Sequence, residues 1–113
     1  MSNIKISGRI FDDPVMRYTK TGKAVLSWKI GLYTGKTGDD YNKSVWVTCY
    51  AWEQEAERLN GVLAKKMAVT VEGQPLPPRT YEKDGIEKQV GLEINARRVA
   101  IGDEFGPVAE ENF

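Results

Sequence analysis

Residues 44–52 read SVWVTCYAW, and their alternation is unusual for a core strand. Side chains in a β-strand point to opposite faces in turn. One face of this stretch is therefore small and apolar, with Val45, Val47, Cys49 and Ala51. The other face is dominated by large rings, with Trp46, Thr48, Tyr50 and Trp52. If the small face packs into a core, the rings point outward, and such an apolar patch indicates a surface that binds a partner.

The rest of the chain predicts four more strands and one short helix around this stretch. We expect strands at 3–11, 24–33, 68–72 and 89–101, with a bulge at Gly8. The helix is expected directly after Trp52, where Ala56, Leu59 and Leu63 recur at helical spacing and Gly61 is a stop signal. Periodicity predicts a small all-β barrel. The order β-β-β-α-β-β matches a five-stranded OB-fold barrel with one short helix between the third and fourth strands.

Length and composition are those of one ordinary soluble domain. The chain has 113 residues, 41% hydrophobic and 28% charged, with no apolar run long enough for a membrane helix and no expected export signal. The lone Cys49 fits a reducing cytosol, and the location expected is cytoplasmic and nucleoid-associated, or the organellar equivalent. The net charge is zero, but residues 1–102 carry 16 bases and 12 acids, a net of +4. We therefore expect a mildly basic domain at 1–102 and a short acidic C-terminal tail at 103–113.

The second strand supplies polar and cationic side chains that share the outward face. Leu26, Trp28 and Ile30 are expected in the core, which leaves Ser27, Lys29 and Gly31 beside the rings. Bases stack on rings while phosphates meet positive charge, a combination suited to single-stranded nucleic acid. The alternative for the rings is packing against a second subunit or under the helix. The candidate binding residues are Trp46, Tyr50, Trp52 and Tyr81 for stacking, with Ser27, Lys29, Lys36, Lys43 and Arg79 for polar and phosphate contacts.

Three segments resemble the bacterial single-stranded DNA-binding protein (SSB) family, in a short form. They are GRIFDDPVMRYTKTGKAV at 8–25, VWVTCYAWEQEAERL at 45–59 and VEGQPLPPRTYEKDG at 71–85, and the likeness covers about residues 1–101. The resemblance implies an OB barrel, usually a homotetramer although a dimer stays open, with DNA wrapped over aromatic and basic surfaces. It also implies that Trp46, Trp52 and Tyr81 correspond to base-stacking rings of the family. The loop 73–81 departs from the pattern by one extra residue and three prolines.

The C-terminal tail resembles the family's acidic tip in part. It keeps Glu110, Glu111 and a terminal Phe113, but it lacks the long linker and most of the acids. In the family, such a tip binds replication and repair proteins, so the resemblance implies a partner-binding tail. The alternative is that the acidic tail folds onto the chain's own basic groove and competes with DNA.

Two other binding functions stay open, and catalysis is not expected. A primosome-type OB adaptor would mainly bind proteins, and an RNA-binding OB protein would share the stacking surface. The chain has no histidine and no cysteine pair, so we expect no enzyme, no cofactor and no metal. The GKTG at 35–38 resembles a phosphate loop, but the first glycine of that motif would fall at Ile30. Single-stranded DNA, protected during replication, recombination and repair, is the expected ligand.

Overall fold

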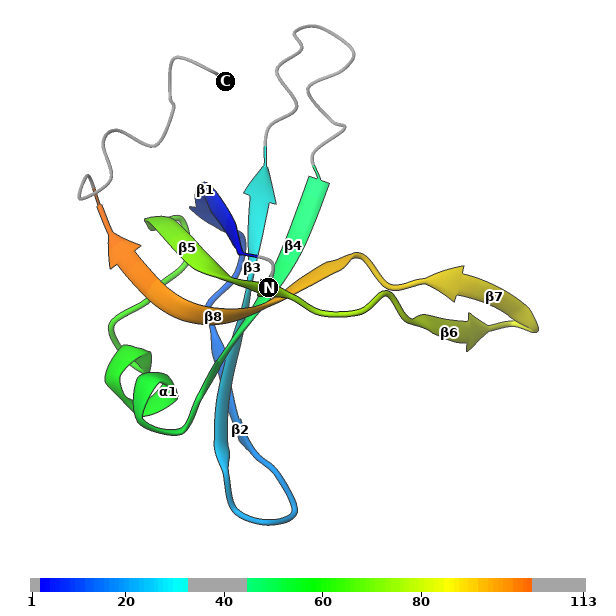
Figure 1. Cartoon of the computed structure of the whole chain (residues 1–113), viewed down its shortest axis with the longest axis horizontal. Coiled ribbons are helices and arrows are strands. Elements are labelled where there is room, and N and C mark those ends of the chain that lie inside the picture. The colour runs from blue at the N-terminus through cyan, green and yellow to red at the C-terminus, as the bar shows by residue number, and fades with distance from the viewer. Residues whose placement is uncertain (1–2, 33–44, 103–113) are drawn as a thin grey trace, which may run out of the picture.

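Five strands close into a barrel in the computed structural model, which describes residues 3–32 and 45–102 (Figure 1). One helix and two short hairpin elements accompany them. The elements in chain order are β1 (Ile4–Ile10), β2 (Val15–Tyr18), β3 (Ala24–Leu32), β4 (Val45–Trp52), α1 (Glu53–Leu59), β5 (Ala68–Pro75), β6 (Thr80–Lys83), β7 (Ile86–Gln89) and β8 (Leu92–Ile101).

The barrel closes because β1 pairs with two different strands. Its residues 4–9 pair with β5, and Arg9 and Ile10 pair with Gly31 and Ile30 of β3. The order around the ring is β1-β5-β8-β4-β3, and β4 with β8 is the parallel pair among these five strands. The five strands expected from the sequence are those that form the ring, with the helix between the third and fourth. The predicted OB-fold barrel is confirmed.

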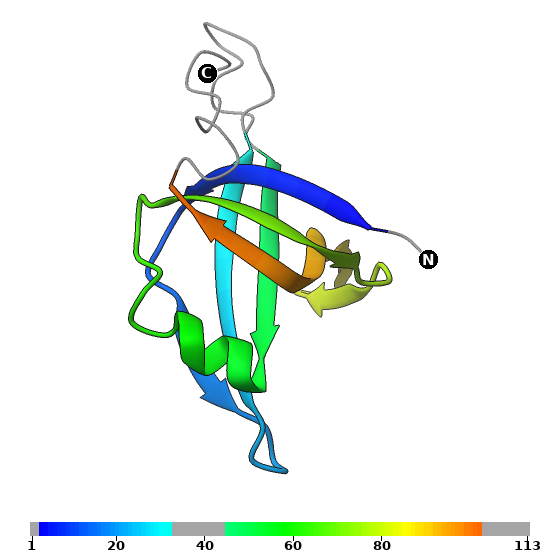
Figure 2. The same cartoon turned by 60° about the vertical axis from the view of Figure 1, so that its left-hand side comes forward.

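The small face of the opening stretch lines the barrel interior, as its alternation predicts. Val47, Cys49 and Ala51 have no exposed surface, and Trp28 on β3 is 3% exposed. Fully burying a valine side chain such as that of Val47 stabilises a fold by about 1.5–3 kcal/mol. The helix α1 closes one end of the barrel, beside the ends of β3 and β4 (Figure 2), and buries Ala56 and Leu59.

The helix ends at the point that the sequence indicates. Its C-cap is Asn60, and Gly61 follows with φ of 84°, a left-handed conformation that favours glycine. Glu53 and Glu55 occupy the first turn, where acids complement the helix dipole. Within the described residues a membrane-crossing helix is absent, since α1 has only seven residues.

The predicted bulge at Gly8 is wrong. Gly8 pairs regularly with Val69, and the register instead shifts between Glu72 and Gly73, where β5 lies against β8. A Cβ on Gly73 would stand 2.0 Å from the backbone oxygen of Asn95. Only glycine allows the two strands to approach so closely, so the irregularity lies on β5, where strand crowding requires it.

Two short pairings were not expected from the sequence. The residues after Asp12-Asp13-Pro14 form β2, which extends β3 as a hairpin. Residues 80–89, which lie almost entirely within the segment 73–88 expected as a loop, form the hairpin of β6 and β7, which projects away from the barrel as a separate arm (Figure 1). We refer to residues 80–89 as the arm. The fourth strand also runs to Pro75, three residues past the predicted end, and β8 begins at Leu92.

Candidate functional site

The rings of β4 share one outward face with the polar side chains of β3. Paired residues on antiparallel strands lie on the same face, and the register sets Trp46 opposite Gly31, Thr48 opposite Lys29 and Tyr50 opposite Ser27. Trp46 is 44% exposed and Trp52 is 40% exposed. We call this surface the platform, defined as Trp46, Tyr50 and Trp52 with Ser27, Lys29 and Gly31.

Trp46 lies close to Gly31 of β3 and against a second ring. A Cβ on Gly31 would stand 2.7 Å from the Cζ3 atom of Trp46, so glycine makes room for the indole. Phe11 meets Trp46 edge to face, with ring centroids 4.8 Å apart, and Phe11 is 54% exposed. Sequence reasoning missed Phe11, although its position, two residues beyond Arg9, continues the outward face of the first strand.

At the other end of the platform, Tyr50 joins a buried carboxylate. Its hydroxyl donates to Glu93 Oε2 at 2.5 Å, and Arg79 donates to both carboxylate oxygens, from Nε at 2.7 Å and from Nη2 at 2.8 Å. Glu93 is only 5% exposed. The parallel register of β4 and β8 creates this contact, because it sets Thr48 beside Glu93 and Tyr50 beside Asn95.

These contacts change the acidity of all three groups. The hydrogen bonds from Arg79, and secondarily that from Tyr50, lower the pKa of Glu93 to about 2, although burial acts in the opposite direction. Burial and the hydrogen bond to Glu93 raise the pKa of Tyr50, and the same carboxylate raises the pKa of Arg79. Glu93 is therefore ionised at neutral pH, and its charge balances that of Arg79. Sequence reasoning found Arg79 and Tyr50 but missed Glu93, whose partners come from distant parts of the chain.

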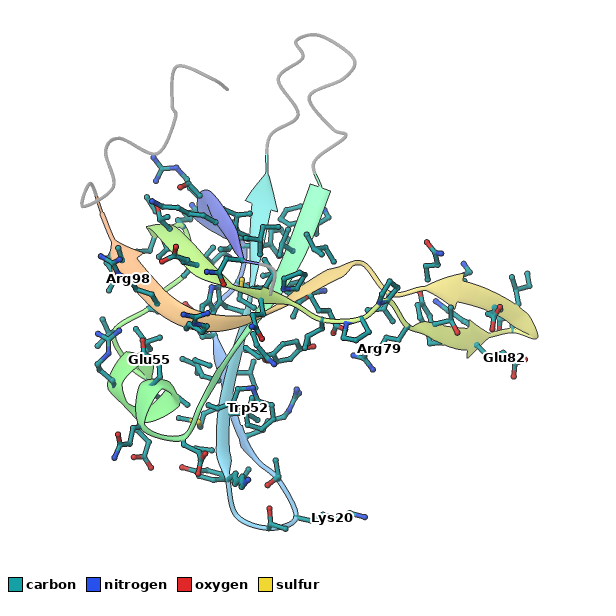
Figure 3. All side chains as sticks on the ribbon, viewed as in Figure 1. Lys20, Trp52, Glu55, Arg79, Glu82 and Arg98 are labelled. Carbon is teal, nitrogen blue, oxygen red and sulfur yellow. The ribbon has the colours of Figure 1, made fainter. Side chains whose placement is uncertain are left out.

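A cavity of about 510 Å³ opens beside this network. Trp52 and Tyr50 border it from β4, and Arg79 lies where the arm leaves the barrel (Figure 3). The indole Nε1 of Trp52 donates to Asn95 Oδ1 at 3.1 Å. The cavity is lined by Tyr50, Trp52, Leu76, Pro77, Pro78, Arg79, Glu93 and Asn95.

The arm has one cationic, apolar side and one acidic side. Tyr81 pairs with Lys88 and Lys83 pairs with Ile86, so these four side chains lie on one face. The opposite face carries Thr80, Glu82, Glu87 and Gln89. Tyr81 is 47% exposed and Ile86 is 60% exposed. The sequence prediction included Tyr81 but not its neighbours on the same face, which the hairpin register brings together.

The remaining predicted residues fall outside the part of the chain that the structure describes. They are Lys36 and Lys43 of the predicted loop, and Glu110, Glu111 and Phe113 of the predicted tail.

Comparison with known proteins identifies one family. Residues 1–101 match the model of the single-strand binding protein family. The chain is similar to the Single-stranded DNA-binding protein 2 of Streptomyces coelicolor, with 33% identity over 94 residues, 77% of this chain and 46% of that protein. It is also similar to the Single-stranded DNA-binding protein of Corynebacterium glutamicum, with 32% identity over 111 residues, 94% of this chain and 46% of that protein. The Bacillus subtilis Single-stranded DNA-binding protein A is 26% identical over 102 residues, 88% of this chain and 58% of that protein. The chain thus spans about half the length of these curated relatives.

Proposed function

We propose that this chain, which belongs to the single-strand binding protein family, binds single-stranded DNA with little dependence on sequence. Its role would be to protect exposed strands during replication, recombination and repair, without catalysis. The observation that carries the proposal is the platform, where the exposed rings of Trp46 and Trp52 flank Lys29 on one face of the sheet. Every base has a face that stacks on such rings, so a platform of this kind binds strands of any sequence.

Each group of the site has a task in this proposal. Bases stack on Trp46, Tyr50, Trp52 and Tyr81, and each stacked base contributes about 1–3 kcal/mol. Lys29, which is exposed beside Thr48, neutralises phosphate. Lys36 and Lys43 would add further phosphate contacts. Ser27 supplies a hydroxyl beside Tyr50. Arg79 contributes hydrogen bonds more than charge, because Glu93 already balances it.

Several copies acting together would strengthen this binding. We propose a homo-oligomer, with a tetramer favoured over a dimer, since linked weak surfaces add through effective concentration. The acidic tail, with Glu110, Glu111 and Phe113, is proposed to bind replication or repair proteins. The proposed location is the cytoplasm, in association with the nucleoid.

The test is tryptophan fluorescence during titration with dT oligonucleotides of increasing length, with duplex DNA and U oligomers in parallel. Trp28 is 3% exposed, so quenching by the ligand reports on Trp46 and Trp52. We expect strong quenching by dT and little response to duplex. Absence of quenching by dT at low salt would refute the proposal and favour a protein-binding adaptor. Equal or tighter binding of U oligomers would identify RNA as the ligand.

Single substitutions test the platform itself. Trp46→Ala is expected to weaken dT binding by about 1–3 kcal/mol through the loss of one stacked base. The matched control is Tyr18→Ala, which removes an exposed ring from β2, outside the platform, and should leave the affinity unchanged. An unchanged affinity of Trp46→Ala, with the fold intact by circular dichroism, would assign Trp46 to a subunit interface instead.

A further inference from the structure

We infer that the cavity beside Trp52 seats one nucleobase and recognises acceptor atoms on the edge of that base. This inference rests on the proposed function and deepens it, because it makes one position of the bound strand selective. The cavity volume, about 510 Å³, lies within the range of about 300–1,000 Å³ that is typical of small-molecule sites.

The walls of the cavity suit a flat heteroaromatic ring. Trp52 and Tyr50 supply aromatic faces, and Leu76, Pro77 and Pro78 supply an apolar border. A hydrogen bond from the Leu76 backbone N–H to the Glu93 carbonyl oxygen, 2.8 Å long, holds this border against β8. The cavity is therefore largely apolar with a few placed polar groups, as in other sites that orient a small ring.

The orientation of the Asn95 amide is determined by Trp52. An indole N–H can only donate, so the oxygen of Asn95 must face it, as the 3.1 Å bond from Trp52 Nε1 shows. The amide NH₂ of Asn95 then points away from the indole. Among the described residues, no side chain or backbone acceptor is hydrogen-bonded to that NH₂ group, and Asn95 lines the cavity.

The other polar groups of the lining also offer donors. Glu93 accepts three hydrogen bonds, from Tyr50 and twice from Arg79, which leaves its carboxylate little acceptor capacity. Arg79 uses two of its five N–H groups on Glu93, and its side chain remains 63% exposed. The network carries no net charge, so the cavity is better suited to a neutral base than to a phosphate.

A donor-rich lining selects bases by their edges. Cytosine presents O2 beside N3 and guanine presents O6 beside N7, so each offers two adjacent acceptors. Adenine places its N6 donor beside N1 and beside N7, so one of the two donors of the cavity would meet another donor. We therefore expect the cavity to favour cytosine and guanine over adenine.

The experiment compares the affinities of dC and dA oligonucleotides of equal length for three proteins: the natural chain, Asn95→Asp and Asn60→Asp. Asn95→Asp keeps an oxygen for the Trp52 indole but replaces the donor NH₂ with an acceptor. Asn60→Asp makes the same chemical change at the exposed end of α1, away from the cavity. The added negative charge lowers the affinity for both oligonucleotides alike. Self-stacking of the dA oligonucleotide lowers its affinity equally for all three proteins. The ratio of the two affinities therefore isolates edge recognition.

The expected result is a dC-to-dA ratio about fivefold lower for Asn95→Asp than for the natural chain, and an unchanged ratio for Asn60→Asp. If Asn95→Asp does not fold, Asn95→Ala removes the amide donor without added charge, and the same fall in the ratio is expected. A folded Asn95 variant whose ratio stays within twofold of the natural value overturns the inference while the proposed function stands. Failure of the natural chain to bind either oligonucleotide refutes the proposed function itself.

Discussion

The charge balance between Arg79 and Glu93 leads to a prediction about salt dependence. Glu93→Gln removes the negative charge to which Arg79 donates at 2.7 Å and 2.8 Å. Arg79 then becomes an uncompensated cation beside the platform. For single strands, log K falls with log salt by about 0.7 for each phosphate neutralised. We therefore expect Glu93→Gln to steepen the salt slope of dT binding by about 0.7, which is about 2.6-fold in affinity between 50 and 200 mM salt.

The paired variant is the decisive control. Replacing both residues, as Glu93→Gln with Arg79→Gln, removes no net charge, so the slope should return to the natural value. Lys29→Gln removes an exposed platform cation and should flatten the slope by about 0.7. Fluorescence titrations with one dT oligonucleotide at several salt concentrations give all four slopes. A double variant with a slope as flat as that of Lys29→Gln would show that Arg79 neutralises phosphate in the natural protein, and the charge-balance argument would fail.

Three further predictions concern stability and reactivity. Gly73→Ala places a Cβ 2.0 Å from the Asn95 backbone oxygen, so chemical denaturation should show that the free energy of unfolding falls by at least about 2 kcal/mol. A fall of less than about 0.5 kcal/mol would contradict the crowding of β5 and β8. The pKa of Glu93 is lowered from 4.5 to about 2, so its ionised form stabilises the fold above pH 4.5, and this stabilisation should be lost as the pH falls toward 2. In thermal unfolding, Glu93→Gln should therefore make the melting temperature depend less on pH over this range. Burial raises the pKa of Cys49 to about 12, so a thiol reagent should modify it only at the rate of unfolding, and rapid modification of the native protein would refute its burial.

Local patterns in the sequence account for the five barrel strands, the helix and the direction of the rings, but not for the short strands β2, β6 and β7. Alternation along residues 45–52 depends only on the period of a strand, so it separates the buried Cys49 from the exposed Trp46 without knowledge of any partner. The helix is equally local, because Ala56 and Leu59 recur at its own spacing. The position of the bulge is not local. Gly8 and Gly73 look alike in sequence, and only the approach of β8 decides that the irregularity lies at Gly73.

The sequence by itself therefore predicted a small all-β barrel and the outward rings, because period-two and helical patterns record which side of each element is buried. The OB topology was predicted from the order of the elements and from the resemblance to a known family. Only the tertiary structure decided what stands beside those rings. Tyr50 and Glu93 are 43 residues apart, as are Trp52 and Asn95, and both contacts exist because closure of the barrel sets β4 and β8 in parallel register. A pairing between distant strands leaves no trace in the alternation of either strand. The balance of charge at Arg79 and the donors of the cavity thus follow from the folded barrel, and not from any single segment.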